Sequence, residues 1–84
     1  MSVVPVTQLS LSRQRKAMSD ALDDHSWESI AGIDNALSSA LDAAVADPEK
    51  DMKVLLSELG EILKVYKQVV LSSQAEADEL IAGA

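Results

Sequence analysis

The last third of the sequence constrains the fold most strongly. From Pro48 to about Ala82, apolar residues recur at helical spacing, with no internal proline and a single glycine, Gly60. Asp47 is a favourable N-cap residue, and proline suits the first position of a helix, so the pattern predicts a helix over residues 48–82. Such a helix would be roughly 50 Å long, at about 1.5 Å per residue. It needs packing partners along its whole length and therefore dominates the fold.

The apolar stripe of this helix covers about 200° of its circumference. It comprises Met52, Val54, Leu55, Leu56, Leu59, Ile62, Leu63, Val65, Tyr66, Val69, Val70, Ala77, Leu80 and Ile81. A single packed neighbour usually covers a narrower arc than this. Two interpretations follow: the helix contacts two other helices of its own chain, or it leaves a surplus apolar strip for another protein.

Two shorter helices are predicted before it, at about residues 5–22 and 26–46. The inner face of the second is marked by Trp27, Ile30, Ile33, Leu37, Leu41, Ala44 and Val45. The first has only a narrow stripe, formed by Leu11, Met18 and Leu22, so we expect it to be the least firmly packed element. The sequence thus predicts an all-α fold: an antiparallel three-helix bundle with one long C-terminal helix, in a single helical domain over residues 1–84.

Size and charge exclude several classes of function. A chain of 84 residues buries only about 60% of its unfolded surface, so an oligomer or a client protein would add to a marginal core. The 14 acidic and 7 basic residues give a net charge of −7, which opposes binding to nucleic acid. There is no cysteine, and nothing resembles a secretory or membrane-inserting segment. We therefore expect a cytoplasmic protein with no membrane insertion.

Residues for catalysis or metal binding are scarce. The single histidine, His25, follows Asp23 and Asp24 in the first interhelical turn, where a metal site would need further converging ligands. No serine has a histidine placed to act as a base, and no glycine-rich loop could hold a phosphate. We expect no enzyme activity, no cofactor and no metal, and interpret His25 as a solvated turn or cap residue.

One acidic residue, Asp34, projects from the apolar side of the second predicted helix, between Trp27 and Leu41. An unpaired carboxylate is unfavourable to bury. Asp34 is therefore either a boundary residue that solvent reaches, or the partner of a cation. That cation would be Arg13 or Arg15 of the first helix, or a basic residue of a client.

The second and third predicted helices resemble flagellar export chaperones of the FliT type. The resemblance is carried first by the segment from Asp24 to Leu41, with Trp27, Glu28 and Ile30 opening a helix that Ile33, Leu37 and Leu41 continue. The following helix is similar to the long third helix of that family through Leu55, Leu56, Leu59, Ile62, Leu63, Tyr66 and Val69. The resemblance covers roughly residues 9–82. The resemblance implies a cytoplasmic chaperone that holds the C-terminal helical region of the filament-cap protein and delivers this protein to the export apparatus. In some relatives the chaperone also restrains a flagellar transcription regulator.

An amphipathic client helix lying in an apolar groove is a common mode of protein recognition. We expect such a groove on the second and third helices, with the candidate contacts Leu37, Val45, Leu56, Leu63, Tyr66 and Val70. Tyr66 is favoured among them because a tyrosine offers apolar area while its hydroxyl stays hydrated. The same apolar surface also suits a structural or regulatory helical module that forms a homodimer through the third helix, or a virulence-type secretion chaperone.

Overall fold

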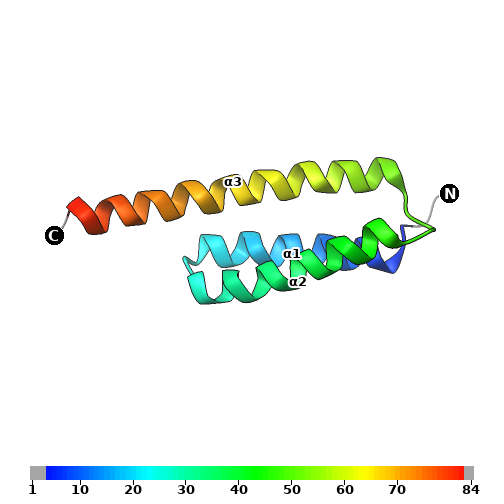
Figure 1. The fold of residues 1–84 in the computed structure, drawn as a ribbon, viewed down its shortest axis with the longest axis horizontal. Coiled ribbons are helices and arrows are strands. Elements are labelled where there is room, and N and C mark those ends of the chain that lie inside the picture. The colour runs from blue at the N-terminus through cyan, green and yellow to red at the C-terminus, as the bar shows by residue number, and fades with distance from the viewer. Residues whose placement is uncertain (1–3, 83–84) are drawn as a thin grey trace.

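The computed structural model describes residues 4–82, which form three α-helices: α1 (Val6–Asp23), α2 (Trp27–Ala46) and α3 (Met52–Ala82). Helices α1 and α2 form an antiparallel pair, and α3 runs back along this pair and continues beyond the α1–α2 turn (Figure 1). The molecule is elongated, with principal extents of 56 × 20 × 18 Å. The predicted all-α architecture, a three-helix bundle with a long C-terminal helix, is confirmed.

The core is a single apolar seam to which all three helices contribute. Its buried members are Leu11, Met18 and Ala21 from α1, Ile30, Leu37 and Ala44 from α2, and Leu55 and Ile62 from α3. Within each helix these residues recur mainly at a spacing of seven, so each helix turns one line of side chains inward. The backbones of α1 and α2 lie closest together, whereas α3 approaches α1 less closely and α2 least of all.

The expectation that α1 would be the least firmly packed helix is wrong. Leu11 and Met18 are the largest fully buried side chains of the described residues. The narrow stripe seen in the sequence is completed by Ala21 and by a polar residue, Gln8, both of which are buried. An apolar pattern could not include Gln8, because its burial depends on hydrogen bonds to a distant part of the chain.

The side chain of Gln8 links the start of α1 to the α2–α3 turn through hydrogen bonds. Its side chain is 3% exposed. Its Nε2 donates to the backbone oxygen of Asp51 at 3.1 Å, and its Oε1 accepts from the backbone N–H of Asp51 at 2.7 Å. Beside it, the hydroxyl of Thr7 donates to Oδ2 of Asp47 at 2.5 Å. Both contacts join residues about forty positions apart in the chain, so they fix the turn against α1.

Helix α3 begins at Met52, not at Pro48, so the predicted start is wrong. Its N-cap is Asp51, whose Oδ1 accepts from the backbone N–H of Val54 at 3.2 Å. Asp47 instead closes the preceding turn, where its side chain accepts from the backbone N–H of Glu49 at 2.9 Å. The hydrogen bond from Thr7 and then this second bond hold the pKa of Asp47 below its usual value. The long-range contacts of Thr7 and Gln8 therefore favour a turn where local capping rules alone favour a helix.

The α1–α2 turn ends α1 with a left-handed residue that is not glycine. His25 has φ 54°. The backbone N–H of Ser26 donates to the oxygen of Ala21 at 2.9 Å, and that of His25 donates to the oxygen of Leu22 at 3.0 Å. This pair of bonds is the Schellman motif, in which glycine usually occupies the left-handed position. His25 therefore holds a conformation that is unfavourable for a residue with a side chain.

Replacing Gln8 by methionine, which has a similar size, should lower the free energy of unfolding by roughly 1 to 3 kcal/mol, because the backbone N–H of Asp51 loses its acceptor. The backbone oxygen of Asp51 loses one of its two donors and keeps the other, the backbone N–H of Leu55. Urea denaturation followed by circular dichroism measures this change. Gln74→Met, at an exposed position of α3, is the matched control and should have little effect. Equal stabilities of the two variants would contradict the structural role of Gln8.

Replacing His25 by glycine should raise the free energy of unfolding by roughly 1 kcal/mol, because glycine adopts the left-handed conformation without strain. His25→Ala keeps the strain while removing the imidazole, so it should not stabilise the protein. Thermal unfolding of the three proteins separates the two effects. Stabilisation by alanine equal to that by glycine would show that the imidazole, and not the backbone conformation, is unfavourable.

Candidate partner-binding surface

Helix α3 exposes part of the broad apolar arc that its sequence carries. Leu55 and Ile62 point into the core. One residue further along the chain in each case, Leu56 and Leu63 lie on an adjacent sector of the helix, and Val70 continues their line at the same spacing of seven. These three side chains are 61%, 69% and 53% exposed, respectively. We call Leu56, Leu63 and Val70 the α3 strip. Met52, also exposed, lies four residues before its first member.

The six predicted contact residues do not line one groove. Three of them form the α3 strip, whereas Leu37 is 2% exposed and belongs to the core, so it offers no surface to a partner in this structure. Val45 is exposed near the end of α2. It shares a helical side with Trp27 and Asp34, which both bond to α3, so it lies on the side of α2 that faces α3.

Tyr66 is half-buried at the edge of the α3 strip, between the strip and α2. Its hydroxyl donates a hydrogen bond to Oδ1 of Asp34. Burial, and then the hydrogen bond and negative charge of Asp34, raise the pKa of Tyr66 to about 12. The proposed ion pair of Asp34 with Arg13 or Arg15 is therefore replaced by a bond to a tyrosine, which joins α2 to the middle of α3.

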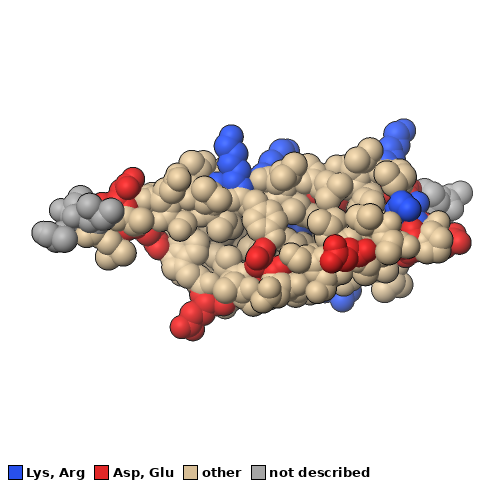
Figure 2. Space-filling model, in the orientation of Figure 1, with Lys and Arg blue, Asp and Glu red and all other residues tan. Residues whose placement is uncertain are grey.

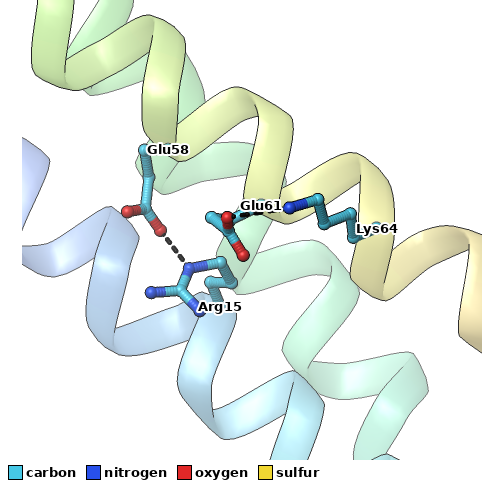
Figure 3. A network of polar contacts seen from close by, with 4 residues as sticks. All are labelled: Arg15, Glu58, Glu61 and Lys64. Carbon is cyan, nitrogen blue, oxygen red and sulfur yellow. Dashed lines mark hydrogen bonds and ion pairs between the residues drawn. The ribbon is translucent and has the colours of Figure 1, made fainter.

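Arg15 is instead directed to α3, where its Nε forms an ion pair with Glu58 (Figure 3). The two side chains are only 20% and 14% exposed, so this pair is less screened by solvent than a surface pair. Nearby, Glu61 and Lys64 form a second pair at 3.2 Å within α3 itself. Both residues are largely exposed, and such pairs add little stability. The Arg15–Glu58 pair is thus the main charged link between α1 and α3.

The distal part of α3 is held by Glu76, a residue that the sequence patterns did not single out. One of its carboxylate oxygens accepts from Nε1 of Trp27, and the other lies 3.4 Å from Nδ1 of His25. The rings of His25 and Trp27 meet edge to face, with centroids 6.4 Å apart. His25 is thus an exposed turn residue that also contacts α3. The only clue to Glu76 in the sequence is its place among the inward positions of the helix.

A metal cluster and a membrane-crossing helix are both absent from residues 4–82. No three His, Cys, Asp or Glu side chains converge there to hold a metal ion. None of the described helices combines the length and apolar character that crossing a membrane requires.

Comparisons with protein families, with curated proteins and with solved structures find no match for this chain. The candidate surface therefore rests on the geometry of its own residues.

The raised pKa of Tyr66 predicts a measurable dependence on pH. Between pH 10 and 12 the unfolded chain releases the phenolic proton while the folded chain keeps it. The contribution of this group to stability is thus complete below pH 10 and is lost as the pH rises towards 12. Because the chain has one tyrosine, tyrosinate absorbance reports this group alone, and the folded protein should titrate about two units above the urea-denatured chain.

Asp34→Asn is the matched variant for this titration. It should lower the pKa of Tyr66 but leave it above 10, because burial is the larger cause of the shift. Identical titration curves for the folded and denatured proteins would contradict the Tyr66–Asp34 contact.

Proposed function

We propose that this chain is a non-catalytic, helix-binding protein of the cytoplasm that acts as a flagellar export chaperone. It holds the C-terminal helical region of the filament-cap protein along the α3 strip. The observation that carries this proposal is the line of three exposed aliphatic residues, Leu56, Leu63 and Val70, on a helix whose inward side chains already fill the core.

The geometry of the strip suits a helical partner. Single exposed leucines are ordinary on protein surfaces, but apolar residues in one line mark interaction sites more often. From Leu56 to Val70 the strip is about 21 Å long, which equals two heptads of a helix. A spacing of seven is the repeat by which two helices pack side by side. A partner helix with apolar residues at this spacing can therefore lie along α3.

The resemblance to chaperones of the FliT type indicates which client is bound. The exposed residues of α3 indicate the surface to which the client binds. Two of the features that carry this resemblance are Trp27 and the long third helix. Trp27 of α2 donates a hydrogen bond to Glu76 of α3, and α3 is the helix on which the strip lies. In this proposal export-apparatus or regulator proteins are further partners, and neither a cofactor nor a nucleic acid takes part.

A second candidate function is a dimerisation module. It is favoured by the same spacing of seven, because two copies of one chain can pair through such a strip. This function places a second copy, not a client, on Leu56, Leu63 and Val70.

The test uses the purified chain and the C-terminal helical region of the filament-cap protein encoded in the same genome. Isothermal titration calorimetry should detect binding, and Leu63→Asp should weaken it at least about tenfold, because a carboxylate would be desolvated against the client. Circular dichroism should show unchanged helicity, since Leu63 is largely exposed. Leu9→Asp, at an exposed leucine of α1, is the matched control and should bind like the wild type.

Absence of binding to the filament-cap region would refute the chaperone function. If light scattering then shows a tight dimer that Leu63→Asp dissociates, the chain is a dimerisation module instead.

A further inference from the structure

Two lysines border the α3 strip on the side away from Tyr66 and α2. Lys53 lies three residues before Leu56, and Lys67 lies three residues before Val70, so both fall on the same flank of the strip. We call Lys53 and Lys67 the lysine border. Both side chains are exposed, and neither forms an ion pair within residues 4–82.

The lysine border differs from the other charges of the first two-thirds of α3. Glu58 is engaged by Arg15, and Glu61 by Lys64. In Figure 2 some of the lysine and arginine side chains lie along the upper edge, over α3, and others lie at the right end and on the lower edge. The acidic side chains lie mainly below the upper edge and at the ends of the molecule. A chain with a net charge of −7 therefore places free positive charge beside its exposed apolar strip.

Between the two lysines, the border is open. Gly60 lies midway between Lys53 and Lys67, and a Cβ atom built on it meets nothing within 4 Å. The lysines are about 21 Å apart along the helix, so they act as two separate charges with a gap between them. A bulky side chain of a partner could occupy this gap without disturbing either lysine.

We propose that the partner of the α3 strip is an amphipathic helix whose apolar edge is bordered by glutamate or aspartate residues two heptads apart. Its apolar side chains contact Leu56, Leu63 and Val70, and its carboxylates face Lys53 and Lys67. This inference rests on the proposed function in its general form, the binding of a helix, and specifies the chemistry of that helix. Complementary rim charges of this kind set specificity and association rate.

The charges favour such a helix over a second copy of the chain. In an antiparallel pair of α3 helices that face each other through the strip, the lysine borders of the two copies lie along the same side of the interface. Each copy also carries a net charge of −7, which adds long-range repulsion.

The experiment uses two synthetic helical peptides of three heptads with the same line of leucines. One carries glutamate at two border positions two heptads apart, and the other carries lysine there. Each is titrated into the isotope-labelled full chain and followed by NMR. The acidic peptide should bind about tenfold more tightly, shift the amide signals between Leu56 and Val70, and lose this advantage at high salt.

The double variant Lys53→Glu/Lys67→Glu should reverse the preference between the two peptides. Arg13→Glu/Lys16→Glu changes the net charge by the same amount at two exposed positions of α1, so it is the matched control and should keep the preference for the acidic peptide.

Three further results would overturn the inference in distinguishable ways. Equal binding of both peptides, abolished by Leu63→Asp, would refute the role of the lysine border while leaving helix binding intact. Binding of neither peptide would refute both proposals, and a stable dimer that excludes both peptides would show that a second copy occupies the strip.

Discussion

The length and apolar breadth of α3 exceed what the rest of the chain can cover, and the other features of the structure follow from this mismatch. A helix of 31 residues lies against helices of 18 and 20 residues. Among the residues whose burial is described, its inward line contributes Leu55 and Ile62 to the buried core. Since α1 and α2 are largely occupied with each other, one sector of α3 keeps its aliphatic side chains in solvent.

Polar contacts hold α3 in place where apolar packing is thin. They occur at four levels along the helix: Gln8 with Asp51 just before its start, Arg15 with Glu58, Asp34 with Tyr66, and Trp27 with Glu76. These long side chains bridge the wider space between α3 and the α1–α2 pair. Polar contacts are directional, so they fix the rotation of α3 about its axis. That rotation determines which of its apolar residues face outward.

The exposed strip and its lysine border are therefore two results of the same rotation. Turning α3 so that Glu58 meets Arg15 and Tyr66 meets Asp34 leaves Leu56, Leu63 and Val70 outside, with Lys53 and Lys67 beside them. Apolar surface alone gives affinity with little selectivity, whereas flanking charge discriminates between partners. In the proposed binding mode, this combination selects one class of helix rather than any apolar surface.

The sequence by itself determined the three helices, their inward seams and the excess apolar arc of α3, because helical periodicity is a local property of the chain. It also indicated Leu56, Leu63 and Val70 as candidate contacts. Only the tertiary structure decided that Leu37 is core, that α3 begins at Met52 and that Asp34 bonds to Tyr66 instead of an arginine. These outcomes depend on the relative rotation of the helices and on hydrogen bonds between residues more than thirty positions apart, and no local pattern contains either.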